Sequence, residues 1–191
     1  MLEYLVFVAA LVSLTAASVY IRSMFKGNTI PNRVTWLMWA IAPLIATVAA
    51  ISNGAGLAVL PVLMSGLCPL LIFIASFFTQ KAYWKLSKLD YLCGILSALA
   101  IVLWYLTREP NLAIVLSIIS DAFAALPTLR KAWINPETES IWPYLTGVFG
   151  PMTSFAAATF WSFSELAFPA YLVIINILLV VAVYNKKLHI H

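Results

Sequence analysis

The chain has 191 residues, of which 63% are hydrophobic and only 9% are charged, and its formal net charge is +4. A soluble domain carries about a quarter charged residues, so this composition cannot build a water-facing surface and lipid must cover most of the chain. A soluble globular protein is thereby excluded. We expect no nucleic-acid partner, because the position of the basic residues is better explained by membrane topology.

Seven apolar runs along the chain are each close to the length of about 20 residues that a transmembrane helix needs. The first run contains Glu3 and has no basic segment before it, so we interpret it as a retained span rather than a signal peptide. Backbone groups in lipid must be paired internally, which predicts helices. The expected spans of this all-α membrane protein are residues 2–21, 34–52, 57–79, 91–107, 112–129, 141–161 and 166–184.

The basic residues divide unequally between the loops that join these spans. Of the 11 lysines and arginines, ten fall in the C-terminal tail and in the loops after the first, third and fifth spans. Only Arg108 falls in one of the alternate loops. Loops rich in lysine and arginine stay in the cytoplasm, so the pattern predicts an external N-terminus and a cytoplasmic C-terminus. With short loops and tails, the chain is expected in the cell (plasma) membrane. The remaining basic residues are Arg22, Lys26, Arg33, Lys81, Lys85, Lys88, Arg130, Lys131, Lys186 and Lys187.

An internal repeat emerges when the chain is aligned with itself, without gaps, so that Arg22 falls on Arg130. At this alignment, which we call the repeat offset, two prolines inside spans also coincide, Pro43 with Pro151 and Pro61 with Pro169. Three spans, one extra span and three spans make two parallel halves, a layout found in transporters. We expect two triple-helix bundles, residues 1–80 and 111–191, joined by a linker helix within 81–110. Whether the chain forms a homo-oligomer is left open.

The segment that follows the fifth span carries a short motif. It begins with Leu126, Pro127 and Thr128, continues with Arg130 and Lys131, and closes on Ser140. This resembles the PQ-loop pattern of the SWEET, SemiSWEET and PQ-loop transporter families, with Thr128 standing where glutamine is usual. The layout of three, one and three spans and the predicted topology are also those of SWEET transporters.

The resemblance implies a solute site between the two bundles, near the middle of the membrane. Asn176 matches an asparagine of the last span that lines this site in SWEET transporters, and Cys68 stands at the equivalent position of the third span. Trp161 is the candidate for the family's tryptophan, with Asn53 as its partner in the repeat. On physical grounds alone, Asn176 either binds a solute or forms a hydrogen bond that packs helices.

Asp121 is the one ionisable residue deep inside a predicted span. A carboxylate at that depth is costly and is by default a candidate functional group. It could carry a proton or bind the solute through a hydrogen bond, and our hypothesis is that it couples inward solute movement to protons. The structural alternative is a protonated carboxylic acid bonded to Ser117, one turn earlier, or to a neighbouring backbone group.

Prolines recur inside the spans, and each removes a backbone hydrogen bond and can kink its helix. Kinks at matching depths would suit hinges for alternating access, and fixed bends required by packing are the alternative. The candidate hinge residues are Pro43, Pro61, Pro127, Pro151 and Pro169.

The function expected from these patterns is secondary transport of a small polar solute, such as a sugar. The spacing of Trp36 and Trp39 also resembles PnuC vitamin transporters, so a vitamin or nucleoside, or an amino acid as in some PQ-loop proteins, stays open as the solute. A ligand-sensing or sorting receptor on the same fold is the alternative of another class. No enzyme, metal or cofactor is expected, because Asp121 is the one carboxylate deep inside a span, no histidine lies in a span, and Cys68 and Cys93 are interpreted as small core residues.

Overall fold

The computed structural model describes residues 4–79 and 86–185, and its regular elements are all helical. Short 3-10 segments flank or join the main helices at Leu57–Val59 (η2), Ser76–Phe78 (η3) and Pro136–Thr138 (η4). The main helices are α1 (Leu5–Phe25), α2 (Arg33–Ser52), α3 (Leu60–Ala75), α4 (Lys88–Thr107), α5 (Pro110–Ile134), α6 (Trp142–Ala157) and α7 (Phe163–Tyr184).

Five segments of the described chain are helical, long and apolar enough to cross a membrane. They are α1, α2, the continuous run Leu57–Phe78 that contains α3, α5 and α7. The predicted sixth span, residues 141–161, is cut short because α6 has only 16 residues, fewer than the about 20 that cross a bilayer at right angles. Five candidate membrane-spanning helices are therefore present in the described part of the chain, and α4 and α6 are not among them.

The early end of α6 has a local cause in the loop that follows it. Ala158 is extended, and Trp161 has a positive φ of 50°. The buried carboxylate of Glu165, in the first turn of α7, accepts a hydrogen bond of 2.9 Å from the amide of Phe160. Because this carboxylate fixes the loop in a tight turn, the helix cannot continue to Trp161, where the sequence had predicted the end of the span.

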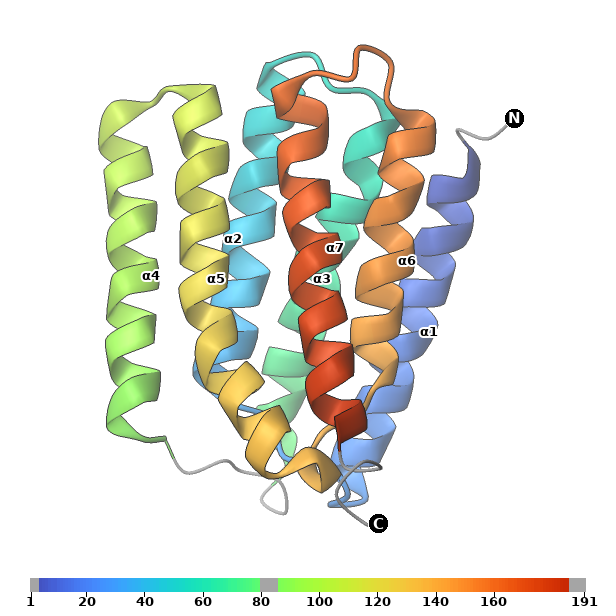
Figure 1. The fold of residues 1–191 in the computed structure, drawn as a ribbon, viewed down its shortest axis with the longest axis vertical. Helices are drawn as coiled ribbons and strands as arrows, with labels where there is room; N and C mark the ends of the chain where they lie inside the picture. Colours follow the sequence, from blue (N-terminus) through green and yellow to red (C-terminus); the bar gives the residue numbers. More distant parts are fainter. Residues whose placement is uncertain (1–3, 80–85, 186–191) are drawn as a thin grey trace.

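The helices pack in two sets of three that are arranged alike. In the first set α3 packs between α1 and α2, and in the second set α7 packs between α5 and α6. The sets meet along two seams, α1 against α6 and α2 against α5, while α4 covers the outer side of α5 (Figure 1). The repeat offset relates α1 to α5, α2 to α6 and α3 to α7, so each helix has the same neighbours as its partner in the repeat.

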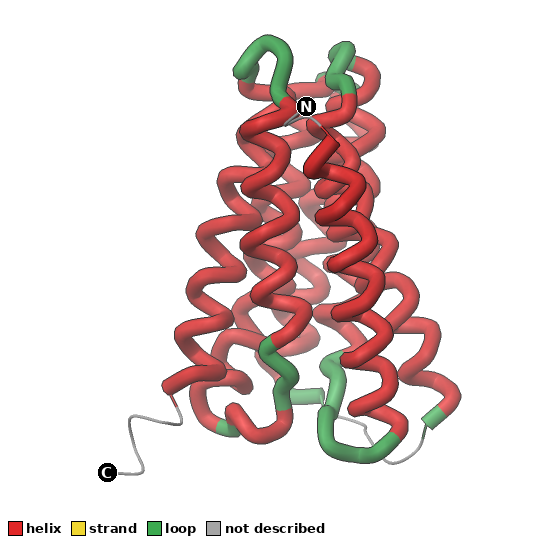
Figure 2. The backbone as a smooth tube through the Cα atoms, turned by 90° about the vertical axis from the view of Figure 1, so that its right-hand side faces the viewer, coloured by secondary structure: helices red, strands yellow, loops and turns green. Residues whose placement is uncertain are grey.

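Loops gather at the two ends of the bundle, with the helices running between them (Figure 2). The chain enters α1 at one end and leaves α7 at the other. Arg22, Arg33, Lys88 and Lys131 all lie at the end where α7 finishes, in the first or last turn of their helices. Arg108 lies at the opposite end, between α4 and α5. We call the end where α7 finishes the basic end. The other lysines of the predicted cytoplasmic side, Lys81, Lys85, Lys186 and Lys187, lie outside the described residues.

Four of the five candidate hinge prolines lie inside helices, namely Pro43 in α2, Pro127 in α5, Pro151 in α6 and Pro169 in α7. Helix α5 bends visibly in the part that leads to its C-terminal end (Figure 1), which is where Pro127 removes a backbone hydrogen bond.

The expectation for Pro61 was wrong. This proline lies in the first turn of α3, where its missing N–H would have no partner in the helix anyway, so it introduces no kink there. The interior proline of α3 is Pro69, which the repeat pattern did not single out because its partner in the second half is Ile177.

Candidate functional site

A cavity of about 80 Å³ lies between the two sets of helices, which is room for several water molecules. It is lined from α1, α2, α3, α5, α6 and α7. Half of its lining residues form pairs that are related by the repeat offset, so the cavity lies where the two halves of the repeat face each other. These pairs are Ser13 with Asp121, Trp36 with Tyr144, Trp39 with Gly147, Met64 with Leu172, and Cys68 with Asn176.

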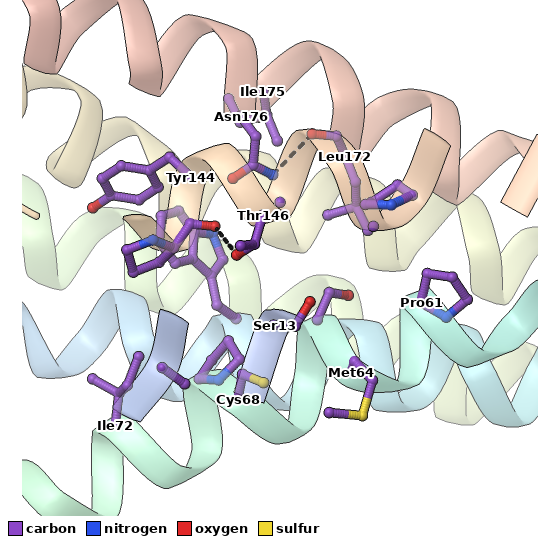
Figure 3. Close-up of a pocket in the computed structure, with 18 of the residues that line it drawn as sticks. Ser13, Pro61, Met64, Cys68, Ile72, Tyr144, Thr146, Leu172, Ile175 and Asn176 are labelled. Carbon is purple, nitrogen blue, oxygen red and sulfur yellow. Dashed lines mark hydrogen bonds between the residues drawn. The ribbon is translucent and has the colours of Figure 1, made fainter. Parts of the chain in front are cut away.

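Asn176 and Cys68 reach the cavity from opposite sides, one from α7 and the other from α3 (Figure 3). The amide of Asn176 donates a hydrogen bond of 2.9 Å to the backbone carbonyl of Leu172, one turn earlier. This bond holds the side chain while one N–H and the carbonyl oxygen of the amide stay available for further hydrogen bonds. Asn176 can therefore both donate to and accept from a small solute.

Gly147 of α6 provides the space that Asn176 occupies. A Cβ placed on Gly147 would lie 2.5 Å from Cγ and 2.8 Å from Nδ2 of Asn176, far inside van der Waals contact. At the equivalent position of the other half stands Trp39, and opposite it stands the small Cys68. The first half thus pairs the large Trp39 with the small Cys68, which makes its wall of the cavity apolar. At the equivalent positions the second half pairs Gly147 with Asn176, which makes its wall polar.

Asp121 lines the same cavity from α5 and is only 2% exposed. The hydroxyl of Tyr171 in α7 donates a hydrogen bond of 2.8 Å to its Oδ2. The predicted partner Ser117 does not serve this role, since its Oγ is buried without a hydrogen bond in the described structure. The carboxyl group is therefore held by the neighbouring helix of its own set, and it is not tied to its own helix.

Four aromatic rings form a continuous wall toward the basic end of the cavity. Tyr20 packs edge-on against Trp36 at 4.9 Å, Trp36 against Trp39 at 5.4 Å, and Trp39 against Tyr144 at 6.2 Å, measured between ring centres. All four are at most 8% exposed. Trp39 also buries its Nε1 without a hydrogen-bond partner among the described residues.

A buried ion pair lies beyond this aromatic wall, at the basic end. Lys131 of α5 and Glu139, in the loop before α6, are 2.6 Å apart, and each side chain is 1% exposed. The hydroxyl of Tyr144 donates to the other oxygen of Glu139 at 2.8 Å, and Lys131 also donates to the backbone carbonyl of Ile30 in the α1–α2 loop. The two halves are thus joined across the basic end, and the cavity is closed there.

Two of the predicted site residues lie away from the cavity. Trp161 is 67% exposed in the α6–α7 loop, where its ring packs against Phe155. Asn53 is the exposed C-cap of α2, and its amide donates to Asn111 of α5 at 3.2 Å. The expectation for Trp161 relied on a sixth span that continued to residue 161, whereas α6 ends at Ala157. Asn53 was included as the repeat partner of Trp161, and it follows α2, which ends at Ser52 as predicted.

Of the candidate hinge prolines, Pro61 and Pro151 line the cavity, whereas Pro43, Pro127 and Pro169 do not. Sequence reasoning missed Gly147 and Tyr144 as parts of the site. The signal was present in the repeat, because Gly147 and Tyr144 are the partners of Trp39 and Trp36. They are found when all residues related by the repeat offset are compared, and not only those that are identical in the two halves.

The chain was compared with known proteins at the levels of family, sequence and structure. No protein family, no characterised protein and no solved structure matches it.

Proposed function

We propose that this chain is a secondary transporter that moves a small polar solute across a membrane by alternating access between two triple-helix bundles. The first bundle comprises α1, α2 and α3, and the second comprises α5, α6 and α7, with α4 as the linker. The observation that carries the proposal is the central cavity, which is lined by repeat-related pairs from both bundles. A cavity on the axis that relates two equivalent bundles is where transporters of this layout bind solute.

The closure of the basic end supports the same function. Four packed aromatic rings and the Lys131–Glu139 ion pair separate the cavity from that end. At the opposite end, the seam between α2 and α5 carries the Asn53–Asn111 hydrogen bond, which is exposed. Exposed polar contacts exchange with water at little cost, so rearrangement is easiest at that end while the basic end stays closed.

Asn176 and Asp121 supply the polar chemistry of the site. Asn176 offers a donor and an acceptor to a hydroxyl or amide of the solute. Asp121 offers a group that can hold a proton in one state and release it in the other, which is the requirement for proton coupling. With a neutral solute, the proton would move in the same direction as the solute.

Counterflow in proteoliposomes tests the proposal without any driving ion. Vesicles that contain the purified chain are loaded with an unlabelled small solute, and entry of the same labelled solute is followed for a panel of sugars, amino acids, nucleosides and amines. We expect transient accumulation of at least one solute. Asn176→Ala should reduce its rate, whereas Asn28→Ala, which changes an exposed asparagine of the α1–α2 loop, should not.

Binding of a panel member without counterflow would contradict transport and favour a receptor on the same fold. An unchanged rate in Asn176→Ala would move the site away from α7.

A further inference from the structure

We propose that the central cavity takes a small organic cation, that is, an amine or an ammonium ion, as its solute. This inference rests on the cavity described under the proposed function and names the chemical class that fits it. It is carried by the charges and the rings that line the cavity.

The charge of the lining is one-sided. Among the described residues that line the cavity, Asp121 has the one carboxyl group, and lysine, arginine and histidine are absent. The buried cation Lys131 is paired with Glu139 beyond the aromatic wall. An ionised carboxylate in such a place is costly unless a positive charge balances it. A cationic solute supplies that charge, whereas an anionic solute would meet a like charge and no basic partner.

The aromatic wall supports the same class of solute. The side chains of Trp36, Trp39 and Tyr144 are among those that line the cavity. The face of an aromatic ring attracts a cation, with tryptophan the strongest, and the attraction grows when water is excluded. Trp39 is 8% exposed and Tyr144 is 1% exposed, so these rings are largely shielded from water. A buried carboxylate and aromatic rings that line the same cavity are the two kinds of group that bind an ammonium ion.

The negative charge of Asp121 can be balanced in two ways. A proton would balance it when a neutral solute is carried, and the organic cation would balance it here. Because the two positive charges compete for one carboxylate, a cationic solute would be exchanged for a proton instead of moving with it. The direction of coupling therefore reports the charge of the solute.

The test measures binding to the purified full-length chain through its thermal unfolding, because a ligand that binds the folded state raises the unfolding temperature. The cationic probes are tetramethylammonium, choline and benzyltrimethylammonium, which differ in size. Choline is compared with two probes of almost the same shape, the neutral 3,3-dimethyl-1-butanol and the anionic 3,3-dimethylbutanoate. We expect at least one ammonium ion to raise the unfolding temperature, and the neutral and anionic probes to have no such effect.

Two kinds of variant then assign the effect to the cavity. Asp121→Asn should weaken binding of the cation at least tenfold, and Glu109→Gln, which removes an exposed carboxylate at the start of the same helix, should leave it unchanged. Trp39→Phe and Trp39→Leu should weaken binding in that order, because the ring charge distribution is reduced and then removed. The comparison of probes on the unmodified chain holds even if one variant fails to fold.

The inference is overturned if none of the ammonium ions stabilises the chain, or if a neutral or anionic probe stabilises it as much as choline does. It is also overturned if Asp121→Asn folds and binds the cation as well as the unmodified chain. Failure of the proposed function is a separate result. A cation that binds but shows no counterflow would refute transport alone, whereas counterflow of a neutral solute without cation binding would refute this inference alone.

Discussion

The backbone amide of Ile30 donates a hydrogen bond of 3.0 Å to the backbone carbonyl of Thr138. The repeat offset brings Ile30 onto Thr138, so each is the partner of the other in the internal repeat. A direct contact between repeat partners is possible only close to the axis that relates the two halves. The loops that precede α2 and α6 therefore meet on this axis, directly beyond the cavity at the basic end.

The fit between Gly147 and Asn176 predicts a steric conflict in Gly147→Ala. The added methyl group would lie 2.5 Å from Cγ of Asn176, and overpacking of this kind costs about 1–3 kcal/mol. We expect a lower free energy of unfolding for Gly147→Ala and a partial recovery when Asn176→Ala is added. A double-mutant cycle measured by chemical or thermal unfolding gives the coupling between the two positions.

Gly150 provides the matched control on the same helix. A Cβ there would lie 3.7 Å from Oγ of Ser13, which is an ordinary contact. Gly150→Ala should therefore be neutral or stabilising, since alanine favours the helix by up to about 1 kcal/mol. Equal destabilisation by both substitutions would show that Asn176 does not occupy the space beside Gly147.

The ion pair at the basic end predicts a large effect of Glu139→Gln. Removal of one partner leaves Lys131 with its charge buried, and breaking a buried pair in this way costs about 3–5 kcal/mol. The two oxygens of Glu139 accept from Lys131 and from Tyr144, whereas glutamine has one carbonyl oxygen, so the variant loses one hydrogen bond together with the charge. We expect a lower unfolding temperature, together with faster thiol labelling in the cavity from the basic end. A variant with unchanged stability would mean that the pair does not hold the closed end.

The distribution of basic residues predicts the orientation in the membrane. In a chain without its native cysteines, Lys26→Cys should resist an impermeant thiol reagent applied to intact cells, because the basic end is expected to face the cytoplasm. Glu109→Cys, at the opposite end, should be labelled readily under the same conditions. Both positions are exposed, so access of the reagent depends on the side of the membrane alone. The reverse pattern would invert the topology.

The position of Asp121 predicts loss of proton coupling in Asp121→Asn. Asparagine keeps the shape and accepts the hydrogen bond from Tyr171, but it cannot titrate. For a neutral solute, the variant should lose accumulation driven by a pH gradient and retain exchange at equal concentrations. For an organic cation, whose binding depends on the carboxylate, accumulation and exchange should both fall. For a quaternary ammonium ion the unmodified chain should accumulate solute when the vesicle interior is acidic, and for a neutral solute when it is alkaline. Accumulation by the variant equal to that of the unmodified chain would make Asp121 a structural acid.

The helices could be predicted from the sequence because apolar runs of this length have few alternatives in lipid. The boundaries were less certain where side chains decided them. Helix α5 continues past the predicted end at Leu129 to Ile134, because Lys131 is paired within the structure by Glu139. Helix α6 ends early because the carboxylate of Glu165 accepts a hydrogen bond from a backbone amide of the following loop. Such a contact to residues earlier in the chain cannot be recognised from the hydrophobic periodicity of the sequence.

The candidate site could be predicted only in part. Cys68, Asp121 and Asn176 line one cavity, as the repeat and the rarity of polar groups in spans suggested. Trp161 was placed at the site through the resemblance, and a sixth helix shorter by one turn leaves it outside the cavity. Asn53 was placed there only as the repeat partner of Trp161, and it caps the end of α2. The role of Gly147 depends on complementary volumes across the two halves, which become visible only when the side chains are placed in three dimensions.

Access to Cys68 from the two sides of the membrane tests alternating access most directly. Cys68 lines the cavity and is 8% exposed, and Cys93→Ala leaves it as the single cysteine of the chain. A small impermeant methanethiosulfonate reagent is added to right-side-out vesicles and, separately, to inside-out vesicles, and the rate of labelling is measured. The account predicts that Cys68 is labelled from both sides, and more slowly from the basic end, where the ion pair and the aromatic wall must first open. Labelling from one side only, or from neither, would contradict it.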